Sequence, residues 1–186
     1  MKSVLGAIIR KVGNEWTEAQ DGSCLAYGVG NLMRMPTRLH ITWDTPQSLK
    51  IESDWGEQTR TLYFRAADVP GTAAGSLQGV SLARWELPVP LGGVQGYRAP
   101  PTGGDLKVMT NRMSAGWLRR NGAPYSADAQ ITEYFQTFTD PLGRDWFDVT
   151  TEVDDPAYLV RSFITSSDFR KEPDGSKWAP HPCKST

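Results

Sequence analysis

Hydrophobic and polar residues alternate with a period of two along most of the chain between residues 38 and 170. Leu39, Ile41 and Trp43, for example, alternate with polar side chains. Successive side chains of a β-strand point to opposite faces, so this pattern predicts half-buried strands joined by tight turns. The predicted strands cover residues 38–43, 48–53, 58–65, 80–87, 105–111, 116–120, 130–138, 145–153 and 162–170.

Eight or nine short strands at hairpin spacing predict an all-β fold, a single antiparallel up-and-down barrel of about eight strands. Closure removes exposed sheet edges, and the interior of such a barrel has room for side chains or one small ligand. A two-sheet sandwich is the alternative. One domain covers residues 1–186, with an irregular segment at 1–35 that includes a short helix near 4–12, and an extended tail at 171–186. Residues 88–104, rich in Pro and Gly, form a loop that is a candidate lid.

Composition narrows the functional classes. Of the 186 residues, 39% are hydrophobic and 22% are charged, and the net charge of -1 gives no electrostatic case for binding nucleic acid or an anionic membrane. No stretch approaches the roughly 20 apolar residues that span a bilayer. The apolar run at 4–9 is too short for a secretory signal, so the chain as written is expected in the cytoplasm. Cys24 and Cys183 have no metal-site spacing, and they are either a disulfide or two separate thiols.

Some charged residues share a strand face with large apolar side chains. For any one of them the simple explanation is an exposed face on which the aliphatic part of the side chain covers a ring. As a set they predict inward-facing charges that pair with one another or with a ligand, because a buried unpaired charge costs several kcal/mol. The set comprises Arg60, Arg119, Glu133 and Asp148.

The stretch GWLRRNGAPYS at 116–126 carries a specific prediction. Arg119 shares its face with Trp117 and is expected to point inward, whereas Arg120 points to solvent. Asn121-Gly122 forms the turn, because this pair tolerates the positive φ angles of tight turns.

The common catalytic and cofactor motifs are missing from the sequence. There is no GxSxG elbow, HExxH pair or phosphate loop, and GVGN at 28–31 precedes no predicted helix. With only His40 and His181, a Ser-His-Asp triad has few ways to form. We therefore predict neither a metal site nor a cofactor.

Four stretches carry a family resemblance: CLAYGVGNLMRMPTRLHITWD, LKIESDWGEQTRTLYF, LKVMTNRMSAGWLRRNGAPYS with ITEYF, and VDDPAYLVRSFITSSDFRKEPDGSKWAPHPC. Together they resemble a family of bacterial proteins labelled hypothetical, over nearly the whole chain from residue 8. The resemblance implies a lipocalin-like β-barrel. Members of that family begin with a signal peptide, which implies a periplasmic or secreted protein and favours a disulfide between Cys24 and Cys183.

The first functional hypothesis is a barrel that binds a small apolar, ring-containing molecule in its interior, with Arg60 and Arg119 anchoring a polar group of the ligand. Its predicted aromatic walls are Trp43, Phe64, Trp85, Trp117, Phe135 and Trp146.

The second hypothesis is a cofactor-free acid/base enzyme in the same cavity, an isomerase, cyclase, hydratase or lyase. Glu133 or Asp148 would be the base, Tyr134 or His40 the acid, and Arg119 would stabilise an oxyanion. Tyr134 and Glu133 alternate on a regular strand, so both can act in one site only across a bulge. A structural or interaction protein with a filled barrel is the third hypothesis, and a homodimer is left open.

Overall fold

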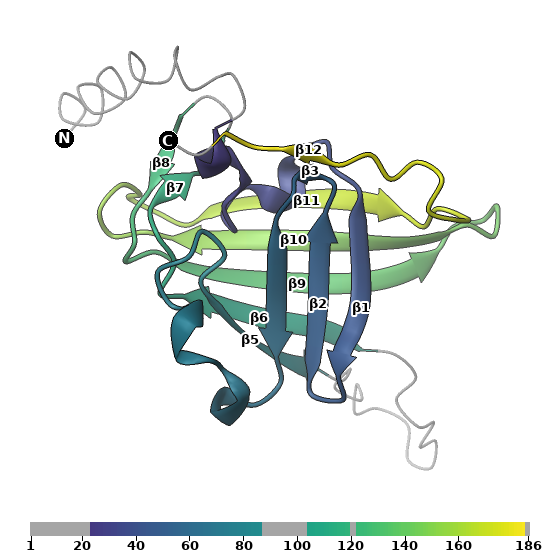
Figure 1. The fold of residues 1–186 in the computed structure, drawn as a ribbon, viewed down its shortest axis with the longest axis horizontal. Coiled ribbons are helices and arrows are strands. Elements are labelled where there is room, and N and C mark those ends of the chain that lie inside the picture. Colours follow the sequence, from purple (N-terminus) through teal and green to yellow (C-terminus); the bar gives the residue numbers. More distant parts are fainter. Residues whose placement is uncertain (1–22, 87–103, 120–121, 185–186) are drawn as a thin grey trace, which may run out of the picture.

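The computed structural model describes residues 23–86, 104–119 and 122–184, and the structural statements below concern these residues. Eight strands form one strongly curled sheet in the order β1-β2-β4-β5-β6-β9-β10-β11 (Figure 1). The fold is therefore all-β, as the alternating pattern predicted. The strands are β1 Leu39–Thr45, β2 Ser48–Ser53, β4 Thr59–Tyr63, β5 Val80–Glu86, β6 Asp105–Asn111, β9 Gln130–Thr139, β10 Asp145–Asp154 and β11 Phe163–Arg170.

Most predicted strands lie within one or two residues of the observed ones. The exception is 116–120, where only β7 (Gly116–Trp117) is a strand, paired with β8 (Pro124–Tyr125). The chain bends after β7, and Gly122, whose φ is 72°, donates its backbone N–H to the carbonyl of Arg119 at 3.0 Å. Gly122 thus has the predicted turn conformation, while Arg120, Asn121, the expected helix at 4–12 and most of the loop at 88–104 lie outside the described residues.

The sheet is not the closed antiparallel barrel that the sequence predicted. Strands β4 and β5 run parallel and share only two residue pairs, Leu62 with Ser81 and Tyr63 with Leu82. Between them residues 64–79, with the short 3-10 helices η3 (Ala66–Asp68) and η4 (Gly71–Ala73), connect the end of β4 to the start of β5, which lies beside it. In the described chain β1 and β11 each pair on one side only. The result is a half-barrel in which β1, β2 and β4 cross the direction of β9, β10 and β11 (Figure 1).

The concave face of the sheet carries the main core. Leu106, Phe135 and Val149 are paired across β6, β9 and β10 and belong to one apolar cluster with Leu49 and Ile51 of β2. A second cluster around Tyr125, Ile131 and Val153 lies toward the β7–β8 hairpin. Side chains on the alternate positions of the same strands form the convex face.

Three glycines, Gly28, Gly30 and Gly116, make room for Tyr125, whose side chain is fully buried. A Cβ on Gly28 would lie 2.3 Å from the Tyr125 hydroxyl oxygen, and one on Gly116 would lie 2.5 Å from the same atom. A Cβ on Gly30 would lie 2.8 Å from Cε1 of the ring. The glycines of the GVGN stretch at 28–31 therefore leave the space that the Tyr125 ring occupies.

A disulfide joins the two ends of the described chain. It links Cys24, in the 3-10 helix η1 (Cys24–Tyr27), to Cys183, which resolves the alternatives that the sequence left open. The tail strand β12 (His181–Pro182) runs parallel to β3 (Trp55–Gly56). Within the described residues no helix is long and apolar enough to cross a bilayer.

Candidate ligand cavity

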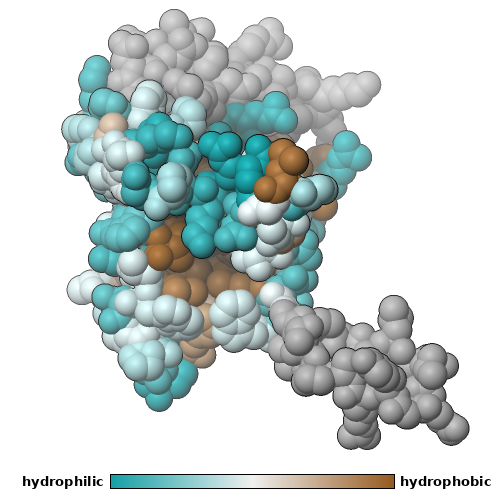
Figure 2. Space-filling view, turned by 90° about the vertical axis from the view of Figure 1, so that its right-hand side faces the viewer, coloured by the Kyte–Doolittle hydropathy of each residue, from teal (hydrophilic) through white to brown (hydrophobic). Residues whose placement is uncertain are grey.

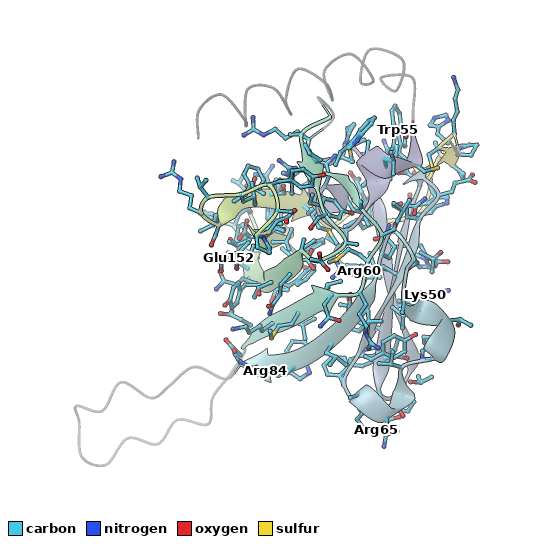
Figure 3. The ribbon with its side chains drawn as sticks, turned by 90° about the vertical axis from the view of Figure 1, so that its left-hand side faces the viewer. Lys50, Trp55, Arg60, Arg65, Arg84 and Glu152 are labelled. Carbon is cyan, nitrogen blue, oxygen red and sulfur yellow. A yellow bond between two sulfur atoms is a disulfide. The ribbon has the colours of Figure 1, made fainter. Side chains whose placement is uncertain are left out.

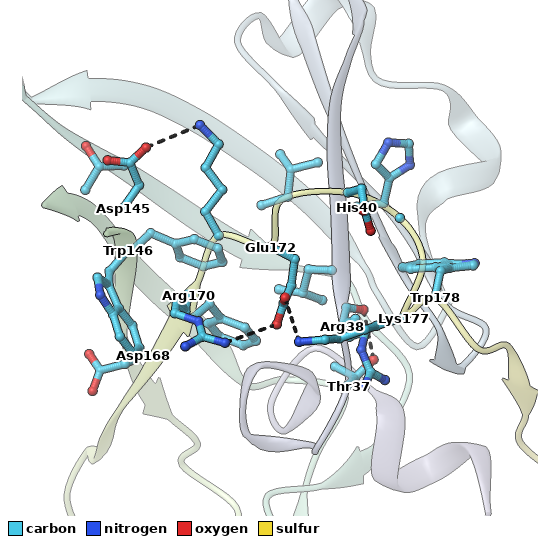
Figure 4. Close-up of a pocket in the computed structure, with 18 of the residues that line it drawn as sticks. Thr37, Arg38, His40, Asp145, Trp146, Asp168, Arg170, Glu172, Lys177 and Trp178 are labelled. Carbon is cyan, nitrogen blue, oxygen red and sulfur yellow. Dashed lines mark hydrogen bonds and ion pairs between the residues drawn. The ribbon is translucent and has the colours of Figure 1, made fainter. Parts of the chain in front are cut away.

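A cavity of about 1420 Å³ lies where β1 and β11, the two edges of the half-barrel, fail to meet (Figure 4). Its walls come from the start of β1, the ends of β9 and β11, the start of β10, and residues 171–178, which we call the strap. The strap runs from the end of β11 to β1, where the Trp178 ring lies 6.2 Å from that of His40. The main apolar wall residues are Leu39, Ile41, Phe138, Trp146, Phe147, Phe169 and Trp178.

Aromatic rings form two rows of neighbouring rings on the concave face of the sheet, and Phe147 and Phe169 of these rows also line the cavity. In one row the ring centroids are 5.5 Å and 6.0 Å apart, and in the other they are 6.4 Å and 4.7 Å apart. Figure 2 views this end of the molecule and shows an apolar hollow between more polar rims. The rows are Trp43–Phe64–Trp85 and Phe135–Phe147–Phe169.

Two of these rings are unusually exposed for their size. The side chains of Trp43 and Trp85 are 56% and 54% exposed, although both project from the concave side of the sheet. Large apolar side chains normally lose most of their contact with water on folding. Rings that stay exposed within a hollow leave apolar surface for a ligand to cover.

Charged groups at the rim neutralise one another. Glu172 pairs with Lys177 at 2.8 Å and with Arg170 at 3.7 Å, and Lys171 pairs with Asp145 at 3.3 Å. The hydrogen bond from Lys177 lowers the pKa of the Glu172 carboxyl. Since these cations already have partners, the rim favours an uncharged ligand over an anion.

The buried charges predicted from the sequence are present, and they are paired. Arg60 is 1% exposed and Glu133 is 0% exposed, and their side chains form a two-pronged ion pair from β4 to β9. The Arg60 guanidinium also donates to Ser81 Oγ at 3.0 Å and to Thr110 Oγ1 at 2.8 Å. Figure 3 shows Arg60 enclosed in the middle of the molecule, whereas Arg84 lies at its periphery.

This network corrects the roles proposed for Arg60 and Glu133. A guanidinium whose two forks hold a carboxylate and two hydroxyls has little capacity left for a ligand. Glu133 is likewise held by Arg60 and has no exposed atom to act as a base. The pair sits between the two apolar clusters and contributes to the core.

Other predicted residues lie on the convex face. Trp146 alternates with Phe147 and stacks on Phe138 at 6.3 Å, and both rings contribute to the cavity wall. Asp148 lies directly opposite Asp168 of β11, and burial, followed by repulsion from Asp168, raises the pKa of Asp148. Tyr134 lies under the ammonium group of Lys107 at 4.9 Å. The pairing of β9 with both neighbours is regular through Glu133 and Tyr134, so no bulge brings the two side chains together.

Three more residues with predicted roles are His40, Trp117 and Arg119. His40 lies at the cavity edge and hydrogen-bonds Glu52 at 3.3 Å, so it points away from Glu133. Trp117 is buried in a third cluster beside the N-terminal 3-10 helices, away from the cavity. Arg119 is exposed, so the prediction that it faces inward is wrong: the chain leaves the strand at Trp117, and alternation no longer applies to Arg119.

Of the six aromatic residues predicted to line the cavity, Trp146 is in its wall. Trp43, Phe64, Trp85 and Phe135 lie on the concave face but are not among the lining residues, whereas Phe147, Phe169 and the strap line the cavity and were not predicted. The signal for Phe147 was present in β10, where Phe147, Val149 and Val153 share a face that is more apolar than the face of Trp146 and Asp148.

Comparisons of the chain with protein-family models, curated protein sequences and solved structures find no match. The described residues also contain no cluster of three or more His, Cys, Asp or Glu side chains arranged to hold a metal ion.

Proposed function

We propose that the protein binds one small, apolar, ring-containing molecule in the hollow of its curled sheet, as a lipocalin-like barrel does. The observation that carries this proposal is the cavity of about 1420 Å³, whose apolar wall includes the stacked rings of Phe147 and Phe169. Ligand pockets are typically concave, mostly apolar and at least about 300 Å³ in volume. Flat ligand rings can extend such stacks at separations of about 4.5–7 Å.

Binding is favoured over catalysis because the predicted acid and base groups do not converge. Glu133 is held in the core by Arg60, Asp148 and Tyr134 lie on the convex face, and His40 is bonded to Glu52. General acid–base chemistry needs these groups within hydrogen-bond reach of one substrate. A filled structural barrel is disfavoured by the size of the cavity.

The test uses a matched pair of substitutions on opposite faces. Ile41→Glu places a carboxylate in the cavity wall, and Ile164→Glu places one on the convex face of β11. The two side chains are 40% and 61% exposed, so neither variant disturbs a buried core. Binding of an uncharged polycyclic aromatic probe is followed by quenching of tryptophan fluorescence.

We expect Ile41→Glu to weaken binding of the probe at least about tenfold, because the ligand would desolvate a carboxylate. Ile164→Glu should leave the affinity unchanged. Equal affinities of the two variants, or no saturable binding by the unaltered protein to any member of a panel of such probes, would refute the proposal.

A further inference from the structure

Two arginines lie over the same aromatic ring at the end of the sheet opposite the cavity. The guanidinium carbon of Arg34 lies 4.9 Å from the ring centroid of Phe163, and that of Arg119 lies 5.4 Å from the same centroid. Phe163 begins β11 and the cavity borders its other end, so the two places are about 20 Å apart at the rise of a strand. Arg34 ends the 3-10 helix η2 (Leu32–Arg34), and Arg119 follows β7.

Neither arginine has a carboxylate partner among the described residues, as is also the case for Arg112 and Arg161. The acids at the nearby end of β10 are already engaged: Asp155 accepts hydrogen bonds from Ser126 and Ala157, and Asp154 accepts one from Ser162. Six other described arginines do form ion pairs, namely Arg38, Arg60, Arg65, Arg84, Arg144 and Arg170.

The half-buried Arg34 is incompletely satisfied. It donates one hydrogen bond from Nη2 to Asn31 Oδ1 at 2.7 Å, while its buried Nε has no partner. Burial and repulsion from Arg119 lower the pKa of Arg34 to about 10. The two guanidinium groups are both positively charged and lie over one ring, so they repel each other. No ion pair with a carboxylate of the described residues offsets this repulsion, and a bound anion would be attracted to both groups.

We propose that Arg34 and Arg119 form a binding site for an oxyanion, a carboxylate or phosphate group, with Phe163 as the platform that holds the two guanidinium groups. Guanidinium forks match the paired oxygens of both groups. The Phe163 ring restricts both side chains before the anion arrives, which reduces the entropy lost on binding. This site is independent of the ligand proposed for the cavity.

The test titrates inorganic phosphate into the full-length, ¹⁵N-labelled protein, with sodium chloride at matched ionic strength as the reference. The Nε–Hε resonance of Arg34 reports the site directly. We expect a saturable shift with phosphate beyond that with chloride. In Arg119→Gln the affinity should fall at least about tenfold, because a charged hydrogen-bond donor is lost. Because Arg119 is exposed, Arg119→Gln should fold normally, so the test does not depend on a substitution of the half-buried Arg34.

The matched control is Arg84→Gln, which removes the same charge from an exposed arginine on β5. Its phosphate affinity should change by less than about twofold, because distant exposed charges are screened. A parallel titration with acetate identifies the group: tighter binding of acetate indicates a carboxylate ligand, and tighter binding of phosphate a phosphorylated one. No saturable response to either anion, or an equal affinity in Arg119→Gln, would overturn the proposal.

Discussion

The close packing around Tyr125 allows a stability prediction that depends on single atoms. In Gly28→Ala the new Cβ would lie 2.3 Å from the Tyr125 hydroxyl oxygen, and its next contacts, Tyr125 Cζ and the Leu77 carbonyl, are at 3.4 and 3.5 Å. Removing the hydroxyl in Tyr125→Phe therefore leaves only ordinary contacts. In Gly30→Ala the close atoms are ring carbons, at 2.8 and 2.9 Å, which Tyr125→Phe retains.

Overpacking of this kind costs roughly 1–3 kcal/mol. We expect Gly28→Ala and Gly30→Ala each to lower the free energy of unfolding by about that amount, and Tyr125→Phe to restore most of the loss for Gly28→Ala only. Neither glycine has a positive φ, so the effect of Gly→Ala on the unfolded chain is similar in both and cancels in the comparison.

Equilibrium unfolding in urea, followed by tryptophan fluorescence, measures the two double-mutant cycles. A coupling energy of at least about 1 kcal/mol is expected for Gly28 with Tyr125, and one near zero for Gly30 with Tyr125. Equal coupling in the two cycles would show that the ring adjusts as a whole and would refute the reasoning.

Three other outcomes can be measured with the same unfolding assay. Arg60→Met leaves the Glu133 carboxylate buried without a partner and should cost about 3–5 kcal/mol, whereas the double variant Arg60→Met/Glu133→Leu should cost clearly less than the sum of its parts. Replacing Cys24 and Cys183 by Ser should lower the free energy of unfolding by roughly 2–5 kcal/mol, because the lost cross-link restricts a long stretch of the unfolded chain; no change would mean that the disulfide does not form. The raised pKa of Asp148 means that its contribution to stability is present below the ordinary pKa of about 3.9 and is lost as pH rises through the folded-state value. Asp148→Asn should therefore stabilise the protein at pH 7 and have little effect near pH 3, and the opposite pH trend would contradict this assignment.

Local alternation was enough to locate the strands of the main sheet, because in most of them one face is more buried than the other. It also identified Arg60 and Glu133 as inward charges, which needed each other because neither could remain unpaired in the core. Closure of the barrel could not be derived in this way. Whether β1 meets β11 depends on the orientation of β4 against β5, and that parallel pairing is a long-range contact that leaves no mark on the period of either strand.

The candidate site was predicted only in part, because alternation describes single strands and not contacts between distant segments. The period of their strands placed Trp43, Trp85 and Phe135 on the concave face, where they are found, although these residues do not line the cavity. The error at Arg119 came from extending that period beyond the last strand residue, Trp117. The strap was missed because the sequence places it in an extended tail, and its position over the cavity follows from the attachment of the tail beyond it to β3.

The central ion pair also separates stability from the proposed binding. Arg60 and Glu133, with Ser81 and Thr110, link β4 to β5, β6 and β9 in the middle of the curled sheet. None of these four residues lines the cavity. If the cavity binds a ligand as proposed, substitutions of the ion pair should lower the free energy of unfolding without changing the affinity of the folded protein.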